Sequence, residues 1–171
     1  MAQQRSPRSN ATDSGADALK LLKADHRKVK KLFDEFEEIK DKPRSNQKKG
    51  ELVRQICAEL TLHAEAEEAI LYPAARKVIK DEELMDEADV EHAGAKELIA
   101  QLEAMDPEDS HYDAKVTVLR EYILHHVKEE ESEMFPKIEK ARLDREKLGD
   151  ELAHFKEEHE ADVESAIHDK R

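Results

Sequence analysis

Hydrophobic residues recur three and four positions apart along most of the chain, with charged residues between them. This spacing places the apolar side chains on one face of an α-helix. Five stretches have the pattern, and short segments that contain Pro, Asn or Asp separate them. The predicted helices cover about residues 17–41, 47–80, 82–102, 107–140 and 144–167. The pattern therefore predicts an all-α protein.

One motif occurs twice on these helical faces. Each copy reads His-x-x-x-Glu-Glu and continues to an aromatic residue followed by proline. Residues four apart share one face of a helix, so each histidine stacks over its glutamate. The matching positions are His63 and His126, Glu67 and Glu130, Tyr72 and Phe135, and Pro73 and Pro136.

The repeat extends to the helix before each motif. Asp25-His26 precedes the first copy and Glu91-His92 precedes the second. The repeated unit is thus a helix with one histidine, a loop, and a helix with the His-x-x-x-Glu motif. Four antiparallel helices joined by short loops predict an up-down-up-down four-helix bundle.

The domain boundaries follow from this organisation. Residues 1–16 are predicted to be a disordered tail, because they are rich in Ser, Arg, Gln and Asn. Residues 17–140 form the bundle, and residues 141–171 form an additional C-terminal amphipathic helix. That helix has a thinner apolar face, so it packs on the outside of the bundle or associates with another chain.

Prolines predict local breaks in the helices. Pro73 and Pro136 lie inside helical patterns, so we expect a kink at each. Asp106 followed by Pro107 has the composition of a helix start, with the aspartate as the cap. The fourth helix is therefore expected to begin at Pro107.

Composition narrows the class of protein. The 171 residues suit one domain with a real core, and 42% of them are charged, as in long amphipathic helices. A net charge of −13 argues against a nucleic-acid partner. The single cysteine, Cys57, fits a reducing compartment. Neither a membrane span nor a signal peptide is evident, so a cytoplasmic location is expected.

The candidate chemistry lies in six polar residues on the apolar stripes. A single histidine there is usually a core residue with a hydrogen-bond partner, and two internal His–Glu pairs are one alternative for the set. Buried carboxylates without partners are unfavourable, however, and a bound cation offsets that cost directly. The predicted ligands are His26, His63, Glu67, His92, His126 and Glu130.

The donor types limit the metal. Imidazole and carboxylate together suit iron, manganese, zinc or copper, whereas calcium and magnesium prefer oxygen ligands. Six ligands are too many for one tetrahedral zinc ion. They fit two metal ions, each held by two histidines and joined by both glutamates.

Other polar residues are weaker candidates. His125 lies one step off the stripe, where it is either solvated or a replacement ligand, and Tyr122 either packs in the core or lies behind the ligands. Glu68, Glu129 and Glu131 are expected at the rim or in solvent. The remaining histidines are expected to be solvated, and these are His111, His154, His159 and His168.

At these residues the sequence resembles the hemerythrin-like, HHE cation-binding family, over about residues 17–140. The resemblance implies a bundle around a carboxylate-bridged centre of two iron ions that binds oxygen, peroxide or nitric oxide, or senses iron. It also implies that the four histidines are terminal ligands and that Glu67 and Glu130 bridge the irons.

The sequence departs from oxygen-carrying hemerythrin at several positions. Lys96 and Ala88 stand where a fifth histidine would form His-x-x-x-His with His92. Glu130 lies four residues after His126, whereas hemerythrin has an aspartate five residues after the equivalent histidine. Ala64 replaces a glutamate that some iron-sensing relatives use. Fewer ligands leave more open metal positions and room for redox chemistry.

Three functions follow as hypotheses. The first is a protein that binds or senses a small oxidant. The second is a di-iron enzyme that decomposes peroxide or reduces nitric oxide. The third is a non-catalytic, iron-responsive interaction module, with the C-terminal helix and the acidic surface as the face for a protein partner or for self-association.

Overall fold

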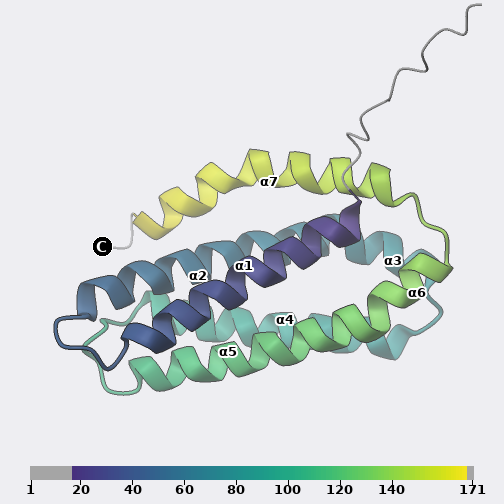
Figure 1. The fold of residues 1–171 in the computed structure, drawn as a ribbon. Helices are drawn as coiled ribbons and strands as arrows, with labels where there is room; N and C mark the ends of the chain where they lie inside the picture. The colour runs from purple at the N-terminus through teal and green to yellow at the C-terminus, as the bar shows by residue number, and fades with distance from the viewer. Residues whose placement is uncertain (1–16, 169–171) are drawn as a thin grey trace, which may run out of the picture.

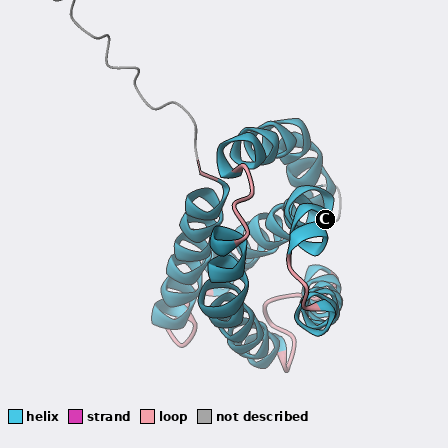
Figure 2. Ribbon diagram, turned by 90° about the vertical axis from the view of Figure 1, so that its right-hand side faces the viewer, coloured by secondary structure: helices cyan, strands magenta, loops and turns pink. Residues whose placement is uncertain are grey.

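The structure, a computed structural model, describes residues 17–168, with side chains up to residue 165. Its described part contains helices and no strands, which confirms the predicted all-α fold (Figure 2). The elements are α1 (Ala18–Ile39), α2 (Asn46–Ala66), η1 (Glu67–Leu71), α3 (Tyr72–Val78), α4 (Glu82–Glu103), α5 (Tyr112–Glu129), η2 (Glu130–Met134), α6 (Phe135–Lys140) and α7 (Arg145–His168).

Four helical rods form the bundle. They are α1, the continuous run α2–η1–α3, α4, and the continuous run α5–η2–α6. Helix α1 packs on α2 and α5, while α4 packs on α5 and α2. The predicted up-down-up-down bundle is therefore confirmed, and α7 lies across the outer face of α1 and α2 (Figure 1).

The predicted distortions at the prolines take the form of π-helical turns. Both turns, η1 and η2, end directly before an aromatic-proline pair. The backbone N–H of Tyr72 bonds to the carbonyl of Glu67, and that of Phe135 bonds to the carbonyl of Glu130. The longer turn rotates each aromatic side chain toward the face that carries the glutamate. Such turns are frequent at functional sites.

The expected start of the fourth helix is wrong. Helix α5 begins at Tyr112, and the preceding His111 adopts a left-handed backbone conformation with φ of 73°. The carboxylate of Asp106 accepts a hydrogen bond from the N–H of Glu108 and its carbonyl accepts one from the N–H of Asp109. Asp106 therefore closes a local turn and does not cap a helix.

The interior consists of two apolar clusters with a polar layer between them. One cluster, which includes Leu22, Met85 and Phe135, extends to Leu148 and Leu152 of α7. The other includes Phe33, Phe36, Ile56 and Leu119 at the opposite end. Cys57 lies in this second cluster, where burial raises the pKa of its thiol to about 12. Packing on both sides fixes the helices that carry the polar layer.

In the described residues, no helix combines the length and the apolar composition needed to cross a membrane.

Candidate metal centre

The six predicted ligands meet in the polar layer. One histidine comes from each bundle rod: His26 from α1, His63 from α2, His92 from α4 and His126 from α5. Glu67 and Glu130 are the first residues of the two π turns. The histidines are at most 9% exposed, Glu67 is 0% exposed and Glu130 is 2% exposed. Side chains from distant parts of the sequence thus share one closed site.

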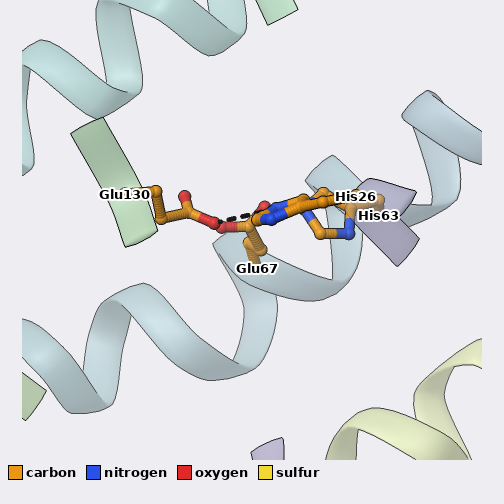
Figure 3. A group of neighbouring side chains, drawn as sticks. All are labelled: His26, His63, Glu67 and Glu130. Atoms are coloured by element: carbon orange, nitrogen blue, oxygen red, sulfur yellow. Dashed lines mark hydrogen bonds and ion pairs between the residues drawn. The ribbon is translucent and has the colours of Figure 1, made fainter. Parts of the chain in front are cut away.

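The six residues form two clusters that have both glutamates in common. The first half-site consists of His26, His63, Glu67 and Glu130 (Figure 3). The second half-site consists of His92, His126, Glu67 and Glu130. Within each half-site the potential ligand atoms all lie within 4.8 Å of one another. Two ions placed in these clusters would share two carboxylates.

Distances between donor atoms match those around a metal ion. The Nε2 atoms of His26 and His63 are 3.2 Å apart, and those of His92 and His126 are 3.3 Å apart. Two donors bound at about 2.0–2.1 Å to one ion lie roughly 3 Å from each other. Glu130 directs Oε1 to His26 Nε2 at 3.3 Å and Oε2 to His126 Nε2 at 3.0 Å. One carboxylate therefore reaches both half-sites, which is the arrangement of a bridge.

Glu67 contacts the two half-sites less evenly. Its Oε1 makes a close ionic contact with His63 Nε2 and lies 4.0 Å from His92 Nε2. Three buried carboxylate oxygens of the centre, Glu67 Oε1, Glu67 Oε2 and Glu130 Oε1, form no hydrogen bond in the described structure, and the ionic contacts of two of them are to the ligand histidines themselves. Such oxygens are unfavourable in an interior and are the atoms that a cation binds. The residues present therefore fit a metal centre.

A carboxylate stands behind each histidine. His63 Nδ1 lies 2.9 Å from Asp25 and His126 Nδ1 lies 3.2 Å from Glu91. His26 Nδ1 lies 3.1 Å from Glu131 and His92 Nδ1 lies 3.4 Å from Glu68. An Nδ1–H that donates to a carboxylate leaves the Nε2 lone pair of a neutral imidazole free to face the centre, which is the usual support for a metal-bound histidine.

These supporting carboxylates extend the sequence interpretation. Glu68 and Glu131 lie at the rim as expected, with side chains 32% and 37% exposed, and each also bonds to a histidine of the centre. Lys96 donates to Glu68 at 2.6 and 2.7 Å. Asp25 and Glu91 directly precede the first histidine of each repeat, and that position is the signal that could have identified them. Charged residues beside an apolar stripe are otherwise typical of a solvated face.

Tyr72 is a site residue that the sequence reasoning missed. Its hydroxyl donates to Glu130 Oε2 at 2.7 Å and lies 3.1 Å from His92 Nε2 and 3.4 Å from His126 Nε2. The phenol oxygen is therefore a further potential metal-ligand atom in the second half-site. The repeat places Phe135 at the equivalent position, where its ring stacks on His26 with centroids 6.1 Å apart. The first half-site has no such hydroxyl.

Electrostatics in the centre favour the protonated forms of His63 and His126 when no metal is bound. Burial alone lowers a histidine pKa, but at His63 the charges of Glu67, Asp25 and Glu130 outweigh it and raise the pKa to about 10. At His126, burial is outweighed by Glu130 and Glu91, and the pKa rises to about 11. Burial raises the pKa of Glu130, but its contacts with His126 and His26 prevail and hold it well below the usual range. In the metal-free protein, protons therefore occupy imidazole nitrogen atoms of His63 and His126 that a metal ion would need.

The weaker candidates lie outside the centre. His125 is 66% exposed, pairs with Glu129 at 3.1 Å and belongs to neither half-site; it clusters with Glu91 and Glu129 beside the centre. Tyr122 is 40% exposed and belongs to neither apolar cluster of the described residues. His154 pairs with Glu158 at 2.9 Å, and His159 bonds to the carbonyl of Phe155. The side chain of His168 lies outside the described residues.

A bundle with two histidine–carboxylate clusters at its centre defines a metal-binding four-helix protein. A model of the family described as "Hemerythrin HHE cation binding domain" matches residues 17–138, and the chain belongs to that family. The bundle and its His/Glu cluster thus form a cation-binding domain of hemerythrin type. Helix α7 follows the matched region.

Two known proteins are similar to this chain. A protein named "DNA nickase" from Nostoc sp. (strain PCC 7120) is 35% identical over 118 residues, which is 69% of this chain and 32% of the relative. The chain thus spans about a third of that protein. A crystal structure of a hemerythrin HHE cation binding domain-containing protein from Mycobacterium kansasii has the same fold, with a TM-score of 0.72 and 22% identity over 86% of this chain and 89% of the other.

Proposed function

We propose that the protein is a carboxylate-bridged di-iron protein that binds a small oxidant, namely oxygen, peroxide or nitric oxide. The observation that carries the proposal is the pair of half-sites that share Glu67 and Glu130. In this proposal His26 and His63 hold one iron, and His92 and His126 hold the other. Iron bound there supplies a Lewis acid and two adjacent one-electron redox centres.

The size of the cavity beside the four histidines favours a small ligand. A cavity of about 30 Å³ is lined by the four histidines and by apolar side chains, among them Val29, Leu60 and Ile123. A cavity of that size holds a diatomic molecule, peroxide or a water. The small volume excludes larger organic substrates.

The chain's own residues would position such a ligand. The four carboxylates behind the histidines hold the imidazole rings in orientation, and the Tyr72 hydroxyl is a hydrogen-bond donor within the centre. Burial and the charges of Glu67 and Glu130 raise the Tyr72 pKa well above its usual value, so the phenol keeps its proton. It can therefore donate a hydrogen bond to an oxygen or nitrogen atom bound nearby.

We do not transfer the nickase activity in the relative's name to this chain, because most of that protein lies outside the matched region. A chain with a net charge of −13 repels a phosphate backbone. We therefore propose a small ligand, and not a nucleic acid, as the molecule that the centre recognises.

Ligand binding to the iron-loaded protein tests the proposal. We expect nitric oxide added to the ferrous form, and oxygen or peroxide added under controlled conditions, to change the optical spectrum in a saturable manner. Replacing Ile123 with Trp fills the cavity from one wall and should weaken ligand binding while two irons stay bound. A spectrum that none of the three ligands changes would rule the proposal out.

Peroxide decomposition is a second candidate, and the Tyr72 hydroxyl favours it. Two molecules of hydrogen peroxide give two of water and one of oxygen, so one peroxide is oxidised while the other is reduced. Reduction of the O–O bond requires protons, which Tyr72 is placed to relay. Sustained oxygen release from peroxide, with a lower rate in Tyr72→Phe at equal iron content, would select this reaction over simple binding.

A further inference from the structure

A groove on the outer face of α4 and α5 has no cover among the described residues. It measures about 910 Å³. The large hydrophobic residues that are exposed in the described chain all line it: Val90 at 68%, Val118 at 46% and Tyr122 at 40%. No lysine or arginine of the described chain lines the groove. Six carboxylates surround its apolar floor, and they belong to Glu83, Asp86, Glu87, Glu91, Glu121 and Glu129. Of these, Asp86 already pairs with Arg76 at 2.9 Å. An apolar floor with a one-sided charge is typical of a binding groove.

The internal repeat shows what kind of element fits there. Helices α4 and α5 repeat α1 and α2, whose outer face is covered by α7. Ala66 is fully buried in the same apolar cluster as Leu148 and Leu152 of α7. The repeat counterpart of Ala66 is Glu129, which lines the open groove. The groove is thus the counterpart of a surface on which a helix is already seated.

A specific charge contact is present on the covered face and missing on the open one. Under α7, Lys156 pairs with Asp25, the carboxylate that supports His63. The counterpart of Asp25 is Glu91, which supports His126 and whose neighbours in the groove are His125 and Glu129. A lysine or arginine from a bound helix would reach Glu91 as Lys156 reaches Asp25.

The negative charge of the groove limits which kind of helix can bind there. Acidic residues outnumber Lys and Arg in α7, so the α7 of a second copy would be repelled by the six carboxylates. The same groove of a second copy has the same charge and would also be repelled. A helix that combines apolar residues at three- and four-residue spacing with basic flanks matches both the floor and the rim.

We propose that the α4–α5 groove is a docking site for a basic amphipathic helix of a partner protein, seated on this repeat as α7 is seated on the other. The partner's apolar stripe covers Val90, Val118 and Tyr122, and its basic residues pair with the rim. Because Glu91 contacts both the groove and His126, the docked helix lies one side chain away from the second half-site.

A synthetic peptide that follows the sequence of α7 provides the probe. It keeps Leu148, Leu152, Phe155 and Lys156 and replaces every Asp and Glu of the helix with Lys. The matched control peptide has the same charge but carries Ser in place of the three apolar residues. Binding is measured by calorimetry on the full-length, iron-free chain, and the site is mapped by amide chemical shifts.

We expect the first peptide to shift signals of α4 and α5 and the control peptide to bind at least tenfold more weakly. Glu87→Lys with Glu121→Lys should weaken binding at least tenfold, whereas the charge-matched Glu97→Lys with Glu133→Lys, outside the groove, should change it little. Gly94→Ala tests the floor separately, because a Cβ there would lie 2.8 Å from the Tyr122 hydroxyl oxygen and displace that ring. Alanine favours the helix, so the bundle should remain folded.

Several outcomes would overturn the proposal. Equal binding of the two peptides would mean attraction by charge alone. Shifts confined to α1, α2 and α7 would mean that the peptide displaces α7. A concentration-dependent dimer that Val118→Ser with Tyr122→Ser abolishes would make a second copy of the chain the occupant.

Discussion

The two half-sites come from matching residues of one repeat, yet they differ in the aromatic residue beside them. In the second half-site the Tyr72 hydroxyl lies among His92, His126 and Glu130. In the first, the ring of Phe135 stacks on His26 and offers no donor. The candidate ligand residues are thus duplicated in the two half-sites, whereas the neighbouring aromatic residues differ. If the proposed pair of ions binds here, they would share Glu67 and Glu130 but have unequal surroundings, because a phenol hydroxyl lies beside the second half-site alone.

The largest expected effect comes from removing a shared residue. Glu67→Ala or Glu130→Ala deletes a carboxylate common to both half-sites, so both ions should be lost or bound weakly. The measurement is iron per chain after gel filtration, with the helical signal of each iron-free variant as the control for folding. A variant that still holds two irons with an unchanged spectrum would show that its glutamate is not a bridge.

Removing a terminal histidine should separate the half-sites. His26→Ala is expected to weaken mainly the ion shared with His63, and His92→Ala the ion shared with His126. Each variant should therefore retain about one iron per chain. The iron-free bundles should stay helical, because alanine suits a helix and a buried polar group is removed. Loss of both ions in either variant would argue against separable half-sites.

Metal affinity should rise with pH over an unusually wide range. The raised pKa values of His63 and His126, about 10 and about 11, mean that both imidazoles are protonated in the metal-free protein at neutral pH. Each displaced proton steepens the dependence by up to about tenfold per pH unit. Titrations against a competing chelator between pH 6 and 9 measure this slope, and a flat profile would contradict the assignment.

The same histidines make the metal-free protein less stable at high pH. A raised folded-state pKa stabilises the fold fully below the unfolded value of about 6.5, and that stabilisation is lost as pH rises through the folded value. We expect the melting temperature of the metal-free chain to fall between pH 7 and 9.5. The metal-loaded chain, in which these imidazoles are already neutral, should not follow it.

The smallest effect concerns the aromatic pair. Tyr72→Phe makes the second half-site resemble the first and removes the hydroxyl that donates to Glu130. The loss should lower the stability of the iron-free protein by about 1–2 kcal/mol and weaken one ion selectively. Phe135→Tyr is the reciprocal variant, which should make the half-sites more alike. Equal affinities of the two ions in the unaltered protein would contradict the comparison.

The clustering of the six candidate ligands could be predicted from the sequence, because polar residues are unusual on an apolar helical stripe. Each of the six residues interrupts an apolar stripe, and the repeat pairs them. Tyr72 could not be predicted, because a regular α-helix turns it away from the face of Glu67. Only the π turn between them brings it back. The proline after Tyr72 was the available signal, since it disfavours the regular turn.

The supporting carboxylates and the start of α5 show a different limit. Asp25, Glu91, Glu68 and Glu131 are as polar as any solvated residue, and only the packing of rods distant in sequence assigns each to a histidine. Asp106 and Pro107 have the composition of a helix start, but local hydrogen bonds close a turn there. Local chemistry allowed both outcomes, and tertiary contacts selected one.

The most direct test of the central claim is a crystal structure of the iron-loaded chain with anomalous scattering at the iron edge. Two peaks per chain are predicted, about 3.5–4 Å apart as in other two-metal sites, with Glu67 and Glu130 between them. One peak should lie beside His26 and His63, and the other beside His92, His126 and the Tyr72 hydroxyl. A single peak, or peaks away from these histidines, would contradict the account.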